Sequence, residues 1–395
     1  MDIHWPTFIL LGVFAGGTWL GIAAIYSQLP LLVSVLPEGH KSFSLTTVIT
    51  QVSNVSILSY ALIRRFWMNM ALEKWILFII LLTNNLILIV PTIQADKILY
   101  LGNTPVSLPL FSSTFILGFF STLSTVVIHP FMGVYPPQYV TGFYIGLSAG
   151  NIVPSLLALV QGSNVVNISC SNMTSKLTHL STKCNNNTQF IQILEGKLFS
   201  TKTFFTIMVL CTTVSLIAFI SLNVVKSLVA IKIQPNLDKE KLPRSGSEDL
   251  EVSLTNLNED QEKITLNQPK TSLSSDSIIL LVNVFVIAML SFAIILGMLS
   301  YTAGSYAYYT LSVSTNLYLA FQAFANLVMI KWTFSSRIVL SVITSLIFLL
   351  TIIMFVIALL AQKGILIQGT FGSVIVVCIL FYIITTLIIN LTLSD

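Results

Sequence analysis

The stretch TFFTIMVLCTTVSLIAFISLNVV, residues 203–225, decides the fold class, because it holds no Asp, Glu, Lys or Arg over 23 positions. A run of that length and composition is typical of a helix that crosses a bilayer. Charged residues make up only 9% of the 395-residue chain, against about a quarter in soluble domains. A water-soluble surface cannot be built from so few charges, so the sequence excludes a globular cytosolic enzyme.

Working outward from this stretch, apolar runs of spanning length recur ten times. They lie at residues 7–27, 43–63, 75–94, 107–128, 139–161, 203–225, 277–300, 304–330, 337–361 and 370–393. The sequence therefore predicts an all-α, polytopic membrane protein with about ten transmembrane helices. The first run lacks a basic segment before it and a small-residue cleavage site after it, so we expect it to remain as the first helix.

The polar segment 162–202 is typical of an extracellular loop. It contains three Asn-X-Ser/Thr sequons, which make Asn167, Asn172 and Asn186 candidate glycosylation sites. The same loop holds Cys170 and Cys184. These two cysteines either form a disulfide in an oxidising compartment or remain as two free thiols.

A second polar segment, residues 226–276, mixes Lys and Arg with acidic residues, Ser, Asn and Pro. That composition is typical of a disordered linker. The linker divides the chain into a six-helix membrane bundle, residues 1–225, and a four-helix membrane bundle, residues 277–395. Two helical bundles joined by a long cytoplasmic linker are the common plan of secondary transporters that work by alternating access.

The short loops predict the orientation in the membrane. Arg64, Arg65 and Lys74 follow the second run, and Lys331 and Arg337 separate the eighth run from the ninth. Because basic residues concentrate in cytoplasmic loops, this distribution places the amino terminus in the cytoplasm. The sequon-bearing loop then falls outside the cell and the linker inside, so two independent signals agree.

Function classes can be excluded as well. Every charged side chain can be placed outside the ten runs, which argues against a cation-coupling site of the usual kind and against a charged substrate. No metalloprotease, nucleophile-elbow or phosphate-loop motif occurs in the sequence, so we predict no enzyme activity and no bound cofactor. No basic tract indicates a nucleic-acid partner.

The runs do contain many uncharged polar and aromatic side chains. One face of the second run and one face of the eighth run are polar, and their members are Thr47, Gln51 and Asn54, and Ser305, Tyr309, Ser312 and Asn316. Two interpretations stay open, namely a polar cavity and hydrogen bonds that join neighbouring helices. Amides and aromatic rings without charges suit a neutral, planar ligand. Gly142, Gly146 and Gly150 form a small-residue stripe that predicts close helix packing.

Short motifs follow one another along the chain in a fixed order. They are Gly17-Thr-Trp19, Gln28-Leu-Pro30, Leu36-Pro-Glu-Gly39, Asn54, Arg64-Arg65, Pro136-Pro137, Thr141, Phe143, Gly146, Pro154, Gln161-Gly162 and Tyr301 with Ser305-Tyr306. In order and spacing they resemble the animal riboflavin transporters, solute carrier family 52. The resemblance covers nearly the whole chain.

The resemblance implies a plasma-membrane protein that takes up riboflavin, with riboflavin as the transported substrate and the lipid bilayer as its surroundings. Riboflavin is neutral at pH 7 and has a flat ring system and a polyhydroxy tail, which agrees with the polar but uncharged runs. The residues that the resemblance implies for substrate binding fall into two groups. Trp19, Tyr301 and Tyr306 would stack on the ring, and Gln28, Asn54, Thr141 and Ser305 would form hydrogen bonds.

This chain also departs from the family pattern. Gln28 and Leu147 stand where the family has Glu, and Ala23 stands where it has Asn. The family is usually drawn with eleven helices, whereas this chain ends at Asp395, after the tenth run. These departures leave two alternatives, which are a non-transporting membrane receptor or regulatory protein with the carrier fold, and a carrier of another neutral aromatic solute such as a nucleoside.

Overall fold

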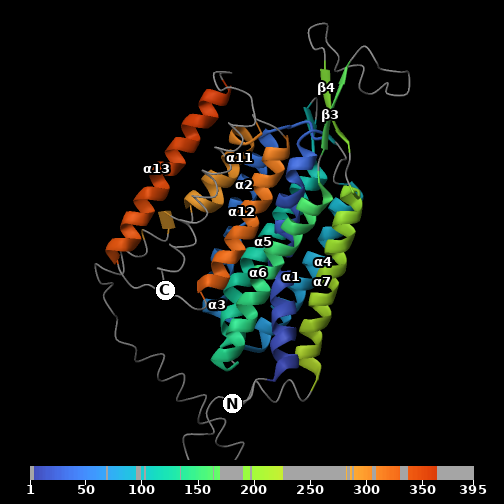
Figure 1. Cartoon of the computed structure of the whole chain (residues 1–395). Coiled ribbons are helices and arrows are strands. Elements are labelled where there is room, and N and C mark those ends of the chain that lie inside the picture. The colour runs from blue at the N-terminus through green and yellow to red at the C-terminus, as the bar shows by residue number, and fades with distance from the viewer. Residues whose placement is uncertain are drawn as a thin grey trace, which may run out of the picture.

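The computed structural model shows long helices that lie side by side and two short hairpins (Figure 1). It describes residues 4–67, 70–94, 99–101, 104–133, 135–162, 164–169, 190–195, 198–225, 282, 285–286, 289–304, 308–329 and 337–362. Helices suit a bilayer because each one satisfies its own backbone hydrogen bonds.

The first half of the chain forms seven helices. They are α1 (Trp5–Leu32), α2 (Lys41–Val52), α3 (Val55–Trp67), α4 (Met70–Gln94), α5 (Leu108–Met132), α6 (Pro137–Gln161) and α7 (Thr201–Val224). Within the described residues, six helical stretches are long and apolar enough to cross a membrane, and these confirm the first six predicted spans. The second of them contains both α2 and α3, which meet at a turn over Ser53 and Asn54.

The second half contributes a π-helical segment (Met289–Ile295) that continues into α11 (Leu296–Thr302), followed by α12 (Tyr308–Met329) and α13 (Arg337–Gln362). These helices fall on the seventh, eighth and ninth predicted runs. The tenth run and the linker lie outside the described residues, so the division into two bundles joined by a linker stays a prediction.

Two antiparallel hairpins add a little β-structure to the expected all-α fold. Strand β1 (Leu99–Leu101) pairs with β2 (Thr104–Val106), and β3 (Asn164–Ser169) pairs with β4 (Phe190–Glu195). The β3–β4 hairpin extends beyond one end of the helices, and the amino terminus lies at the other end (Figure 1). We call these the hairpin end and the amino-terminal end.

Local hydrogen bonds fix several helix ends. The Ser200 hydroxyl accepts from the Thr203 N–H at 3.1 Å and so caps α7. The Glu38 carboxylate accepts from the backbone N–H and the hydroxyl of Ser107, at 2.8 and 2.7 Å, at the start of α5. Helix α6 ends at Gly162, whose φ of +67° is favourable only for glycine.

Two hydrophobic clusters fill the bundle. The shared core takes side chains from both halves of the chain, among them Leu29, Phe204, Leu299, Leu311, Tyr318 and Ile347. The amino-terminal core takes its described side chains from the first half alone, among them Leu11, Phe14, Leu77, Phe131 and Phe219. Of the two clusters, only the shared core contains described side chains from both halves.

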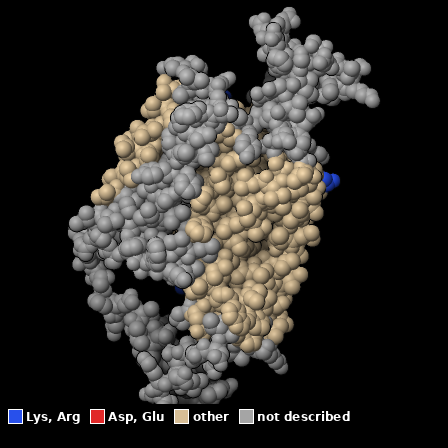
Figure 2. Space-filling model, in the orientation of Figure 1, with Lys and Arg blue, Asp and Glu red and all other residues tan. Residues whose placement is uncertain are grey.

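Helices α1 and α6 approach closely at the predicted glycine stripe. A Cβ atom on Gly146 would overlap the Gly12 carbonyl, and one on Gly150 would overlap the Gly16 carbonyl. The expectation that this stripe serves helix packing is therefore confirmed. The face of the molecule in Figure 2 is largely free of charged residues, as a surface in contact with lipid requires.

Candidate functional site

Buried polar side chains gather where the two halves of the chain meet. Helix α12 packs against α6 and against α1. We call the polar side chains of this region, with their partners on α2, the polar layer. Its members are Tyr26 and Gln28 of α1, Thr47 and Thr50 of α2, Gln161 of α6, and Asn316 and Tyr318 of α12.

Tyr26 links α1 to α2 within the polar layer. Its hydroxyl donates toward Thr50 Oγ1 at 3.2 Å and toward Thr47 Oγ1 at 3.5 Å. Both threonine hydroxyls donate in turn to carbonyl groups of their own helix, so each is free to accept from the phenol. Tyr318 of α12 belongs to the same buried cluster as Tyr26.

A pair of amides joins α1 to α6. Gln28 Nε2 donates to Gln161 Oε1 at 2.6 Å, and Gln161 Nε2 donates to the Phe199 carbonyl at 2.9 Å. Both glutamine side chains are fully buried. The backbone carbonyl of Gln161 also accepts from the Leu198 N–H at 3.0 Å. Gln161 therefore ties the end of α6 to α1 and to the segment that follows the β3–β4 hairpin.

Several buried polar atoms in and beside this layer lack a hydrogen-bond partner among the described residues. They include Gln28 Oε1, Asn316 Oδ1, Ser314 Oγ, Ser27 Oγ and Thr46 Oγ1. The Asn316 amide nitrogen is occupied, because it donates to the Ser312 carbonyl at 2.9 Å. A buried acceptor without a partner is costly, so such atoms call for a water molecule or a ligand with hydroxyl or N–H groups.

Trp19 and Gln28 lie on the same helix as Tyr26. Trp19 is half-buried and packs against the shared core, nine positions before Gln28. Nine positions correspond to about 13 Å along a helix. At about 100° per residue, nine positions also place the two side chains on opposite faces of α1, whereas Trp19 shares a face with Tyr26, seven positions on. One flat ligand therefore cannot contact both Trp19 and Gln28, and their predicted roles stay predictions.

Asn54 lies at the turn between α2 and α3, and its side chain is exposed. Its amide donates to Gln51 Oε1 at 3.0 Å. An exposed amide inside a membrane span fits a water-filled path better than contact with lipid, because lipid offers it no hydrogen bond. The placement is consistent with the polar face that the sequence predicts for the second span.

The remaining predicted binding residues are spread along the bundle. Thr141 is half-buried near the start of α6 and precedes Gln161 by 20 positions, about 30 Å along the helix. Tyr301 is half-buried near the end of α11. Ser305 and Tyr306 lie outside the described residues. Thr141 and the Gln28–Gln161 pair therefore cannot touch one small ligand at the same time. If both bind the substrate, they would contact it at different points along its path.

The two halves also touch at the hairpin end. The Ser44 hydroxyl donates to the Gly297 carbonyl at 2.9 Å, and the Ser300 hydroxyl donates to the His40 carbonyl at 2.8 Å. A Cβ atom on Gly304 would overlap the Ser300 carbonyl and lie 2.8 Å from His40 Cε1. Burial lowers the pKa of His40 below its ordinary value. We call Ser44, His40, Gly297, Ser300 and Gly304 the closure contact.

Sequence reasoning gave no role to two residues that the structure makes prominent. Gln161 occurs in the ordered motifs, and its signal was an amide at the very end of an apolar run. Glu73 precedes the third predicted run, 75–94, and counts among the charges expected outside the membrane. It instead lies within α4, its side chain is only 5% exposed, and it accepts from the Tyr60 hydroxyl at 3.4 Å. Burial by tertiary packing, which no local pattern reveals, separates this carboxylate from the solvated ones.

The predicted loop chemistry falls mostly outside the described residues. Asn167 lies in strand β3, whereas Asn172, Asn186, Cys170 and Cys184 are not described. In the part of the chain that the structure describes, no group of three or more His, Cys, Asp or Glu side chains could hold a metal ion. The disulfide and the glycans stay predictions.

Comparisons with known proteins bear on the whole chain. A sequence profile described as "Solute carrier family 52, riboflavin transporter" matches residues 3–391. "Solute carrier family 52, riboflavin transporter, member 3-A" of Danio rerio is 32% identical over 222 residues, which cover 55% of this chain and 49% of that protein. Member 3 of Homo sapiens is 31% identical over 166 residues, which cover 42% of this chain and 35% of that protein.

A nematode relative and a solved structure complete the comparison. "Riboflavin transporter rft-2" of Caenorhabditis elegans is 30% identical over 161 residues, 40% of this chain and 34% of that protein. The matched segments thus span about half or less of these relatives. A bacterial homolog to the human lysosomal transporter Spinster, solved inward-facing and unoccupied, aligns over 99% of this chain and 82% of its own, with 11% identity and a TM-score of 0.40.

Proposed function

This chain belongs to solute carrier family 52, the riboflavin transporters, and on that premise we propose that it takes up riboflavin across the plasma membrane by alternating access. The family match over residues 3–391 carries the proposal. The relatives at about 30% identity are named as riboflavin transporters, which supports the same substrate.

The chemistry of the polar layer supports a neutral, flat substrate. Its members are amides, hydroxyls and phenols, and none of them carries a charge at neutral pH. The rings of Trp19, Tyr26 and Tyr318 offer surfaces for stacking. The unpartnered oxygens of Gln28 and Asn316 can accept from ribityl hydroxyls or from the imide N–H of the ring. An uncharged site avoids the cost of an unpaired buried charge when the substrate leaves.

The arrangement of the halves supports alternating access. The closure contact and the shared core join them at the hairpin end. Helix α3 is the half of the second span that lies at the amino-terminal end of the bundle, and it packs chiefly on α5. Asn54, in the turn before it, and Leu58 and Leu62 within it are exposed. We infer that this is a state closed at the hairpin end, and that transport requires the closure contact to open.

We propose that the hairpin end is extracellular and the amino-terminal end cytoplasmic. The sequon at Asn167 lies in the hairpin, and the basic residues Arg64 and Lys74 lie at the opposite end. Removal of glycans with an endoglycosidase should increase the gel mobility of the wild-type protein. The Asn167→Gln variant, if it still carries all its glycan, would show that Asn167 is unmodified.

The uptake experiment tests the function directly. Cells that express the chain should show saturable uptake of radiolabelled riboflavin that excess unlabelled riboflavin blocks. Trp19→Ala should lower uptake more than surface expression, because the half-buried ring would be lost from the substrate path. Surface-localised protein without saturable uptake would contradict transport.

The same experiment separates the alternatives. Purified protein that binds riboflavin without any flux in proteoliposomes would favour a receptor. A competition panel in which a nucleoside displaces riboflavin more strongly than unlabelled riboflavin does would favour a different neutral substrate.

A further inference from the structure

A pocket of about 330 Å³ lies between α3 and α5, away from the polar layer. Four lining residues, Ile57, Tyr60, Ala61 and Arg64, come from α3, and Val126 comes from α5. Arg64 lies nine positions after the start of α3 at Val55, about 13 Å along that helix and away from α2. The pocket therefore lies beside α3, at the amino-terminal end of the bundle.

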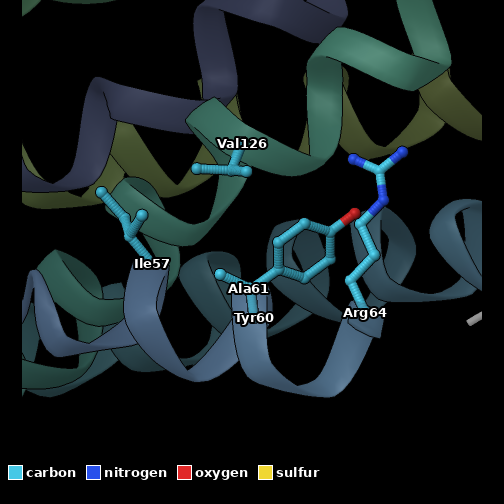
Figure 3. Close-up of a pocket in the computed structure, with 5 residues that line it drawn as sticks. All are labelled: Ile57, Tyr60, Ala61, Arg64 and Val126. Carbon is cyan, nitrogen blue, oxygen red and sulfur yellow. The ribbon is translucent and has the colours of Figure 1, made fainter. Parts of the chain in front are cut away.

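The pocket is apolar at one end and polar at the other. Figure 3 shows Ile57 and Val126 on one side, and the Tyr60 hydroxyl and the Arg64 guanidinium on the other. The two polar groups point to the same region (Figure 3). A ligand that fits this shape has an apolar body and a polar head.

The charge of Arg64 is available for that head. Its side chain is exposed and forms no ion pair or hydrogen bond with the described residues. The nearby carboxylate of Glu73 is buried and accepts from the Tyr60 hydroxyl. A guanidinium presents a rigid fork of N–H donors that matches the oxygens of a phosphate. The head that best satisfies Arg64 is therefore an anion with several oxygens.

The position of Arg64 along the membrane normal fits an amphiphilic ligand. Trp5, the first residue of α1, and Trp75, the sixth residue of α4, are 63% and 66% exposed at the same end of the bundle. Exposed tryptophans at helix ends typically mark the boundary between headgroups and hydrocarbon. Arg64 ends the second candidate membrane span, Lys41–Arg64, at this boundary. The apolar end of the pocket then lies on the hydrocarbon side.

We propose that this pocket binds an organic phosphate, with the phosphate on Arg64 and the apolar body against Ile57, Ala61 and Val126. The site goes beyond the transport of riboflavin, because a neutral vitamin does not need the guanidinium. Two sources share this chemistry, namely an anionic phospholipid of the adjacent leaflet and a soluble aromatic phosphate such as flavin mononucleotide. Basic pockets between transmembrane helices bind lipid headgroups in this way.

The lipid source is tested with the full chain in nanodiscs of phosphatidylcholine and phosphatidylserine. Native mass spectrometry measures how much phosphatidylserine stays bound after the protein is released. Loss of a charge-assisted hydrogen bond in Arg64→Gln should lower retention about tenfold. Lys74→Gln is the matched control, since Lys74 is an exposed basic residue at the same end that does not line the pocket. We expect it to retain the lipid nearly as well as the wild type.

The soluble source is tested in nanodiscs of phosphatidylcholine alone, with flavin mononucleotide as the probe and its fluorescence anisotropy as the readout. Arg64→Gln should weaken binding of the probe about tenfold, and Lys74→Gln should not. Val126→Phe fills the apolar end without touching the charge, so it tests the pocket even where Arg64→Gln fails to fold. A loss in either arm supports the site and identifies its source. Equal lipid retention and equal probe affinity in the wild type and in these variants would overturn the proposal.

Discussion

At the hairpin end, residues from both halves of the chain share one hydrophobic core and the closure contact, whereas at the amino-terminal end the described core comes from the first half alone. The hydrogen bonds of the closure contact are few, and each contributes about 1 kcal/mol. The helices themselves keep their backbone hydrogen bonds in any arrangement of the halves. On the alternating-access proposal, opening this end would break the closure contact and part of the shared core without rearranging secondary structure.

The largest expected effect comes from breaking the hairpin end at Gly304. Any side chain there would overlap the Ser300 carbonyl and press on His40, so Gly304→Leu should force α11 away from the loop before α2. We expect riboflavin uptake to fall by about tenfold or more, which corresponds to roughly 1.4 kcal/mol.

Gly133→Ala is a fitting control for this variant, because a Cβ atom there makes only ordinary contacts at 3.5 and 3.6 Å. The opening can be followed separately by the rate at which an impermeant thiol reagent labels Ser44→Cys. Labelling and uptake that stay at the parent rates when Gly304→Leu is added would show that the closure contact does not hold the halves together.

The amide pair is expected to affect the stability of the protein more than the rate of uptake. Gln161→Leu leaves the buried Gln28 amide without its acceptor and the Phe199 carbonyl without its donor, which should lower stability by about 2–3 kcal/mol. The double variant Gln28→Leu/Gln161→Leu removes both buried amides and should be more stable than the single one. Thermal unfolding of purified protein measures both. A double variant as unstable as the sum of the two single ones would contradict a direct pairing.

Asn54 tests the comparison between the two ends of the bundle, because it lies at the turn where the second span passes from the hairpin end to the amino-terminal end. Because the side chain is exposed, Asn54→Ala should change the unfolding free energy by less than about 0.5 kcal/mol. Uptake should nevertheless fall several-fold, since the amide is predicted to face the substrate path. Ser59→Ala is the control, as the Ser59 hydroxyl donates only to its own helix, at the Val55 carbonyl. Equal uptake in both variants would make Asn54 a passive surface residue.

The smallest effect concerns pH at the closure contact. Burial lowers the pKa of His40, so the closed state favours the neutral imidazole and protonation favours opening. The closed state should therefore weaken as pH falls below about 6.5, the ordinary histidine value. Of the charged groups nearby, the Glu38 carboxylate is occupied by Ser107, and Lys41 follows in α2.

Thiol labelling of Ser44→Cys should rise about two- to threefold between pH 7.5 and 5.5, a change that corresponds to well under 1 kcal/mol. With His40→Gln the labelling rate should be flat over that range, after correction for the intrinsic pH dependence of the reagent. A rise that persists in His40→Gln would place the titrating group elsewhere.

The spans were predictable because a bilayer imposes a length and a composition that single residues obey locally. The break in the second span was not, because its cause is tertiary. The Ser53 hydroxyl donates both to Ile49 of its own helix and to the Phe115 carbonyl of α5, at 2.9 and 3.1 Å, and packs against Gly118. A Ser-Asn pair inside an apolar run carries no such information by itself.

The candidate site also has a part that the sequence could predict and a part that it could not. Trp19, Gln28 and Asn54 could be named from the sequence because their types and order resemble a family. Their partners could not, since Gln28 meets Gln161 across 133 positions.

The sequence by itself determined that this is a membrane protein of many helices, and that its predicted spans carry polar side chains but, apart from Arg337 at the start of one, no charged ones. Both conclusions follow from composition, because the free energy of transfer from water into the bilayer is set by each residue type separately. Only the tertiary structure decided which polar atoms are satisfied, that Glu73 is buried, and that the closure contact joins the halves at the hairpin end. Those properties depend on distances between helices, which packing sets and which no single helix contains.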